Sequence, residues 1–245
     1  MNALVPQAQS YLAEAFESQR SRYDPGTSDE IIWRSLGVLG ARNGEGPLGD
    51  PRGLPFEVGT LAISSWSNVD LDIVKQLPAL DTLNLRDCTG VDLSQIGDAL
   101  HLHKVELYRS VVTSLEPLAH RKMHRLAVWG CPLEPRWYDW LREQWAKGTR
   151  GERPKTFPES TWKLSRKLYE RGLVELVAFL DDEGRNRISM AGNGSADAGL
   201  AVLPEEEVDE ILARYPNTTS LEMLAHLRKR FHELVPQIGL VPKAT

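Results

Sequence analysis

The sequence predicts an α/β fold: a short stack of repeated strand units, capped by helices and followed by a small α+β module. Three observations lead there: short apolar segments recur every 21 or 22 residues, helical patterns flank them, and the pattern changes near residue 148. A length of 245 residues fits one domain or two small ones. We expect an N-terminal helical cap with a Gly-rich loop in 1–53, the repeats with a capping helix in 54–147, and the module in 148–245.

The repeats rest on four segments that share the pattern apolar-x-x-apolar-x-apolar. Their middle apolar residues, which are separated by 22, 22 and 21 positions, are Leu61, Leu83, Val105 and Leu126. A single short strand cannot bury its apolar face alone, but stacked units form one continuous core. Three positions after the last apolar residue of each segment come Trp66, Cys88, Ser110 and Cys131. We expect these side chains to form a ladder in the turns, so the two cysteines are predicted to be neither a metal pair nor a disulfide.

Pattern and period together resemble the leucine-rich repeat. Residues 112–118 (VTSLEPL), followed by Met123 and Leu126, are similar to the bacterial internalin-type repeat. The resemblance covers about 58–135, with Trp66 standing where the family has a small residue. It implies a short curved solenoid whose concave strand face binds protein. Internalins are secreted or surface-anchored, and this location is not carried over, because the chain carries neither signal.

The candidate binding surface consists of residues between and just after the buried strand positions. They are Asn84, Arg86, Glu106, Tyr108, Arg109 and Trp129. Tyr, Trp and Arg dominate the energetics of protein interfaces. We expect Arg86, Tyr108 and Trp129 to form a diagonal row across the strands. Two interpretations of Trp129 stay open, namely contact with a partner and packing against the capping helix.

The flanking segments complete the predicted fold. Residues 1–39 read as two helices, whereas 37–53 contain six Gly and two Pro and are expected to be a loop. Aromatic residues at helical spacing predict the capping helix at 134–145. A linker is expected at 148–158. The remaining predicted elements are a helix at 160–171, strands at 173–180, 186–190 and 200–203, and helices at 204–214 and from 219 onward.

Composition excludes several function classes. A net charge of −5 disfavours a general binder of nucleic acid or anionic membranes. No apolar run reaches the ~18 residues that a bilayer span requires. The chain has two cysteines and no readable secretory signal, so a cytoplasmic location is expected. His120 and His124 have the spacing of zinc ligands on a helix but lie on a predicted turn, so no metal site is expected. The Gly-rich segment 192–199 leads into a strand and not into a helix, so no cofactor site is expected there. No catalytic residue is expected.

These observations favour a bacterial cytoplasmic protein that binds another protein without chemistry. The narrower expectation is an immunity or antitoxin protein that neutralises a toxin, because an acidic surface speeds association with basic toxins. One alternative is an effector-type enzyme whose repeats select the substrate and whose residues 160–235 carry the chemistry. A second alternative, nucleic-acid binding through the basic stretch 147–171, predicts steep salt dependence. No oligomeric state is predicted.

Overall fold

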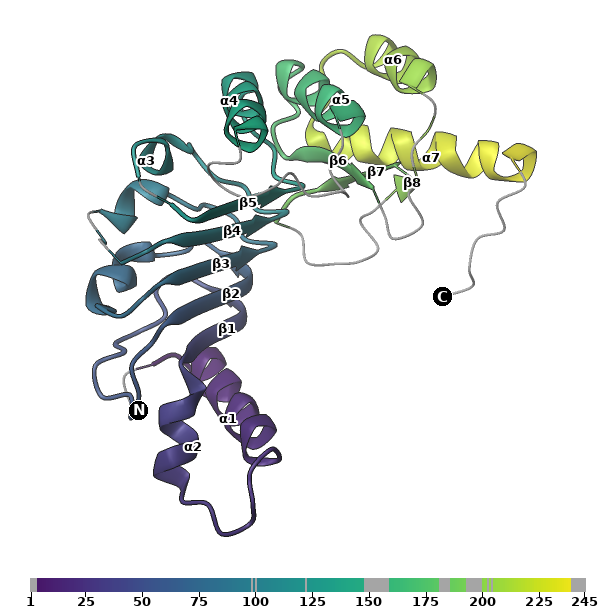
Figure 1. Ribbon diagram of the computed structural model, residues 1–245. Helices are drawn as coiled ribbons and strands as arrows, with labels where there is room; N and C mark the ends of the chain where they lie inside the picture. The colour runs from purple at the N-terminus through teal and green to yellow at the C-terminus, as the bar shows by residue number, and fades with distance from the viewer. Residues whose placement is uncertain are drawn as a thin grey trace.

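The fold consists of a five-stranded all-parallel sheet flanked by helices, and a smaller antiparallel sheet of three strands (Figure 1). The computed structural model describes residues 4–97, 99, 101–121, 123–147, 159–180, 186–192, 200–201, 203 and 205–238. The predicted linker at 148–158 lies outside these residues, as does most of the Gly-rich segment 192–199.

The larger sheet follows the chain in simple order, β1-β2-β3-β4-β5. Its strands are β1 (Val38–Glu45), β2 (Thr60–Ser67), β3 (Thr82–Arg86), β4 (Lys104–Tyr108) and β5 (Arg125–Trp129). In β2 to β5, each strand pairs with the next so that the predicted repeat positions lie opposite each other: Leu61 faces Leu83, Leu83 faces Val105, and Val105 faces Leu126. All four predicted strands are therefore confirmed, in register with the sequence repeat.

The core lies on one side of this sheet. Alternate strand residues such as Leu83 and Leu85 are fully buried there. The connections return along this side through short helices, η1 (Leu71–Gln76), η2 (Leu93–Ile96) and α3 (Glu116–Ala119) (Figure 1). Each connection buries one leucine at the same repeat position, and these are Leu71, Leu93 and Leu115. The 22-residue spacing is thus continued through the connections.

In each strand of the larger sheet, the alternation of inward and outward side chains ends at a residue with a left-handed backbone conformation. The residues concerned have φ between +46° and +60°, and they are Asn43, Ser65, Asp87, Arg109 and Gly130. A left-handed residue turns the chain so that the next side chain points back toward the core. In β2, Ile63 is buried, Ser65 makes the turn, and Trp66 is buried again. This geometry explains the three-residue spacing between the last apolar residue and the predicted ladder.

The Gly-rich loop predicted at 37–53 is wrong for 38–45, which form β1 and pair with β2, whereas 46–53 belong to no helix or named strand, as predicted. Two of the glycines leave room for aromatic rings rather than making turns. A Cβ at Gly40 would lie 2.4 Å from the Tyr11 ring, and a Cβ at Gly44 would lie 2.4 Å from the Trp66 ring. Trp66 fits a position where a small residue was expected because Gly44 faces it across the sheet, and its Nε1 donates to the Gly46 carbonyl (2.8 Å).

We expect Gly44→Ala to lower the free energy of unfolding by about 1–3 kcal/mol, because the added methyl overpacks the contact with Trp66. Urea denaturation followed by circular dichroism measures this change. Gly26→Ala is the matched control, since nothing lies within 4 Å of the added methyl. The double variant Gly44→Ala/Trp66→Leu should show less than the summed loss; full additivity would contradict the proposed contact.

Helices cover both ends of the larger sheet, as expected (Figure 1). At the β1 end lie α1 (Pro6–Arg20) and α2 (Asp29–Leu36), which confirm the two predicted N-terminal helices. Phe16 of α1 stacks on Trp33 of α2 with ring centroids 4.4 Å apart. At the β5 end lies α4 (Pro135–Ala146), the predicted capping helix, and Nε1 of its Trp145 donates to the Leu126 carbonyl (3.3 Å).

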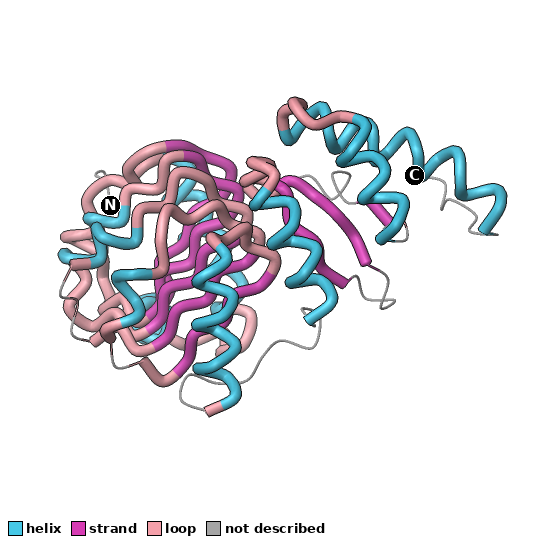
Figure 2. Tube along the Cα trace, turned by 90° about the horizontal axis from the view of Figure 1, so that it is seen from above, coloured by secondary structure: helices cyan, strands magenta, loops and turns pink. Residues whose placement is uncertain are grey.

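The C-terminal elements form a second core beyond the β5 end. They are α5 (Glu159–Glu170), β6 (Leu176–Leu180), β7 (Asn186–Met190), β8 (Leu200–Ala201), α6 (Glu205–Arg214) and α7 (Ser220–Ile238). Figure 2 shows them from above, projecting away from the five-stranded sheet. Leu168, Ile188 and Leu227 are buried in this core. The predicted elements are confirmed, although β6 and β8 are shorter than expected.

Candidate protein-binding surface

The candidate surface is the outer face of the larger sheet, opposite the core. It comprises three rows set by the strand register. The rows are Val38, Thr60, Thr82, Lys104 and Arg125; Gly40, Ala62, Asn84, Glu106 and Ala127; and Arg42, Ser64, Arg86, Tyr108 and Trp129. Of the six predicted site residues, the five on strands lie on this face. Arg86, Tyr108 and Trp129 lie directly opposite one another, so their row is straight and not diagonal as expected.

The third row places an arginine beside two aromatic rings. Cζ of Arg86 lies 5.3 Å from the centroid of the Tyr108 ring, a cation–π distance. The Tyr108 and Trp129 rings have centroids 6.1 Å apart and are tilted by 56°. Trp129 is half-buried and also packs against the main core cluster, which includes Trp137 and Trp145 of α4. The row is therefore a preformed patch of aromatic surface next to a guanidinium.

The Tyr108 hydroxyl stays protonated near neutral pH. Partial burial raises the pKa of Tyr108, and the nearby Glu106 carboxylate raises it further. A protonated hydroxyl can both donate and accept a hydrogen bond.

Four basic side chains and one acidic side chain lie in the three rows. Three of the basic groups are paired with carboxylates: Lys104 with Asp81 (3.1 Å), Arg125 with Glu106 (3.1 Å) and Arg42 with Glu14 (3.9 Å). The Lys104 ammonium is the largest influence that lowers the pKa of Asp81. Within the described parts of the chain, Arg86 forms no ion pair, and its side chain is exposed.

Arg109, the sixth predicted site residue, does not belong to the outer face: it follows the outward Tyr108 and is the left-handed residue after β4. Its Nη2 lies 2.6 Å from Oδ2 of Asp87, the equivalent residue one repeat earlier. Its carbonyl accepts a hydrogen bond from the Gly192 amide (2.7 Å), at the end of β7. Arg109 therefore helps to join the two sheets. The sequence signal for this pair was available, since opposite charges stand one repeat apart.

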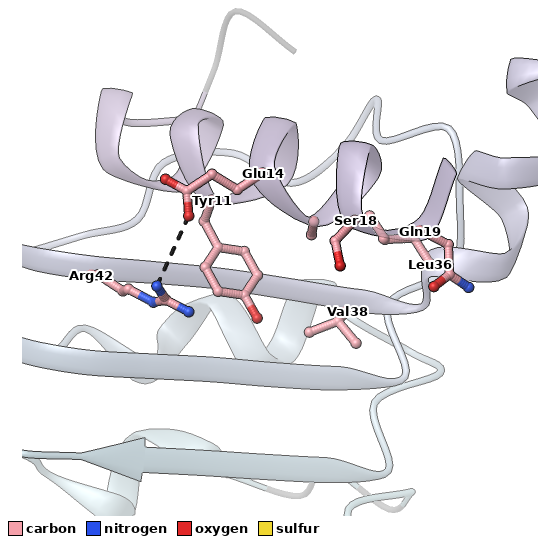
Figure 3. Close-up of a pocket in the computed structure, with 8 residues that line it drawn as sticks. Tyr11, Glu14, Ser18, Gln19, Leu36, Val38 and Arg42 are labelled. Atoms are coloured by element: carbon pink, nitrogen blue, oxygen red, sulfur yellow. Dashed lines mark ion pairs between the residues drawn. The ribbon is translucent and has the colours of Figure 1, made fainter. Parts of the chain in front are cut away.

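A cavity of about 360 Å³ lies between α1 and β1 (Figure 3). Its lining residues are Tyr11, Glu14, Ala15, Ser18, Gln19, Leu36, Val38 and Arg42. Because Val38 and Arg42 are outer-face positions of β1, the cavity continues the outer face at that end. The sequence interpretation missed it, since β1 was expected to be a loop.

The predicted ladder of turn side chains is buried. Oγ of Ser110 accepts from the Cys88 amide (3.2 Å) and donates to the Leu85 carbonyl (3.3 Å). Cys88 and Cys131 are both free and buried. Burial raises the pKa of Cys88 to about 11 and that of Cys131 to about 12. Both thiols are therefore in their unreactive protonated form at neutral pH.

We expect iodoacetamide to alkylate Cys88 and Cys131 at least about 100-fold more slowly than an ordinary thiol at pH 8, since each pKa unit lowers the thiolate fraction about tenfold. Mass spectrometry of the native protein over time measures the rate. The same protein in concentrated urea is the control and should be alkylated at both cysteines. Rapid labelling of the native protein would contradict the buried ladder.

The two histidines with the spacing of zinc ligands, His120 and His124, contact other side chains. His120 lies 3.3 Å from Glu116, and the His124 ring stacks on His103 with centroids 4.8 Å apart. In the residues that the structure describes, no three or more His, Cys, Asp or Glu side chains form a potential metal site.

The part of the basic stretch that lies on α5 is partly neutralised by the chain itself, whereas 148–158 lie outside the described residues. Nζ of Lys167 lies 2.8 Å from both Glu205 and Asp209 of α6. Arg166 pairs with Glu170 (2.9 Å) and with Asp139 of α4 (3.5 Å). These two cations therefore tie α5 to its neighbours.

None of the helices in the described part of the chain combines the length and apolar character that a bilayer span needs.

Comparisons with protein-family models, with curated proteins and with solved structures found no match.

Proposed function

We propose that the chain is a leucine-rich-repeat protein that binds another protein through its outer face. In this interpretation β1 to β5 each belong to one unit of a short solenoid, which the N-terminal helices and α4 cap. The constant register, the buried leucines of the connections and the left-handed residue in every unit support it. A solenoid of this kind presents an extended strand face for binding.

The row of Arg86, Tyr108 and Trp129 carries the proposal. Arginine, tyrosine and tryptophan are the residue types that contribute most to protein interfaces. Here they lie side by side: Cζ of Arg86 is 5.3 Å from the Tyr108 ring centroid, and the tilted Tyr108 and Trp129 rings have centroids 6.1 Å apart. Side chains that are already ordered lose less entropy when a partner binds. The row is thus suited to serve as the centre of an interface.

The narrower role, neutralisation of a toxin by an immunity-type protein, remains a hypothesis within this proposal. So does the alternative that 160–235 carry enzymatic chemistry. The identity of the bound protein separates these hypotheses.

A pull-down from native lysate with the tagged full chain tests the proposed function. We expect one protein in stoichiometric amount, captured by the wild type and lost with Tyr108→Ala/Trp129→Ala. The control is Ile31→Ala/Leu221→Ala, which removes two exposed apolar side chains on α2 and α7 that do not belong to the outer face. Circular dichroism checks that each variant is folded. Equal capture by all three proteins would remove the outer face from the proposal.

A further inference from the structure

We propose, on the basis of the function above, that the outer face binds an acidic segment of the partner protein. A carboxylate of that segment pairs with Arg86, and a neighbouring apolar or aromatic side chain packs on Tyr108 and Trp129. This inference opposes the expectation from composition, in which an acidic chain attracts a basic partner.

The first argument is the separation of charge. The chain has a net charge of −5, whereas the three rows of the outer face carry four basic groups and one acidic group. Asp81 and Glu14 pair with two of these basic groups and Glu106 with a third, so the excess at the face is one positive charge, that of Arg86. The sign of the field that a partner meets depends on the charges near the contact, because salt screens those beyond about 10 Å. The excess charge that the outer face offers a partner is therefore positive and is centred on Arg86.

The second argument is that the single acid of the face is already satisfied. Oε1 of Glu106 lies 3.1 Å from Nε of Arg125. Its Oε2 accepts a hydrogen bond from Nδ2 of Asn84 (3.3 Å). A basic side chain of a partner would have to compete with both contacts to reach Glu106.

The third argument is the environment of Arg86. Its guanidinium is exposed, forms no ion pair within the described residues, and lies over the Tyr108 ring. Its neighbour on β2, Ser64, is too short to cover it. A guanidinium presents a planar fork of donors that matches a carboxylate in two parallel hydrogen bonds. Stacking on Tyr108 holds this fork in place before the partner arrives.

The fourth argument concerns specificity. The remainder of the acidic chain repels an acidic partner at most orientations, and the excess positive charge at Arg86 attracts it at one. Complementary charge of this kind selects the orientation of encounter as well as the partner.

Peptide display on the immobilised full chain tests the inference and does not require the partner protein itself. A random linear peptide library is selected at low salt, and one synthetic peptide from the enriched set is then titrated by fluorescence anisotropy. The proteins compared are the wild type, Arg86→Glu, Tyr108→Ala/Trp129→Ala and Arg34→Glu. Arg34 is the charge control, because it undergoes the same charge change on α2, where its side chain is 72% exposed and pairs with Glu30 (2.6 Å).

We expect the enriched peptides to combine Asp or Glu with an adjacent aromatic or large apolar residue. Arg86→Glu should weaken binding by about tenfold or more, as expected for loss of a charged hydrogen-bonded pair. Arg34→Glu should leave the affinity within about twofold, since exposed charges far from the contact contribute little.

Two other results overturn the inference, and they differ in what they mean for the proposed function. Basic or uncharged peptides whose binding requires Tyr108 and Trp129 would overturn the acidic segment while the binding face stands. If no enriched peptide depends on Arg86, Tyr108 or Trp129, the inference is overturned as well. The pull-down then decides separately on the proposed function.

Discussion

Replacing Trp162 with alanine should lower the free energy of unfolding by about 3–5 kcal/mol, the usual cost of emptying a large buried aromatic site. Trp162 lies on α5 and is 5% exposed. Its ring centroid lies 5.6 Å from that of Tyr138 and 5.4 Å from that of Trp145, both on α4. Trp162 belongs to the core of the larger sheet, whereas Leu164 and Leu168 of the same helix belong to the second core.

The effect should therefore be more than a loss of stability. Because Trp162 connects the two cores, we expect Trp162→Ala to separate one unfolding transition into two in urea, with the C-terminal elements unfolding first. Far-UV circular dichroism and limited proteolysis at intermediate urea measure this. Val174→Ala, at a site that is 42% exposed, is the control and should change stability by no more than about 0.5 kcal/mol. A Trp162→Ala protein with one unshifted transition would contradict the connecting role.

The sequence predicted best those elements in which the buried side chains recur at a regular spacing along the chain. Leu83 and Val105 stand 22 residues apart, and the strand register pairs them. The aromatic spacing of α4 likewise placed Trp137 and Trp145 in the core. In both cases local pattern and tertiary packing require the same side chains to be buried.

The predictions that failed depend on contacts between segments. Gly40 and Gly44 read as turn residues, but each is needed because an aromatic ring from another element occupies the space of a Cβ. No local pattern distinguishes these two reasons for a glycine.

The charge of the candidate site was hidden for a related reason. The net charge counts every residue of the chain, whereas the outer face contains only alternate side chains of five strands. Arg109 is likewise displaced from the predicted face, since it directly follows the outward Tyr108: strand alternation already directs it away from the outer face, and its left-handed backbone ends the alternation there.

That displacement leads to the second large effect, at Asp87. Asp87→Asn should lower the free energy of unfolding by about 2–3 kcal/mol, because it leaves the Arg109 guanidinium without its counter-charge. The Asp87 side chain is 6% exposed and that of Arg109 is 23% exposed. Partial access of Arg109 to water keeps the loss below that of a fully buried pair. Asparagine tolerates the left-handed backbone at this position, so the substitution isolates the charge from the conformation.

The double variant Asp87→Asn/Arg109→Met supplies the control, since it removes both charges and should recover part of the lost stability. If Asp87→Asn alone is neutral in urea denaturation, water reaches the pair and the argument fails. The position of the pair adds a second readout. Because the Arg109 carbonyl accepts from the Gly192 amide (2.7 Å), loosening Arg109 should speed hydrogen exchange at Gly192 before it does so in the centre of the larger sheet. Faster exchange confined to Gly192 and its neighbours would show that the Asp87–Arg109 ion pair, at the ends of β3 and β4, stabilises the contact between the two sheets.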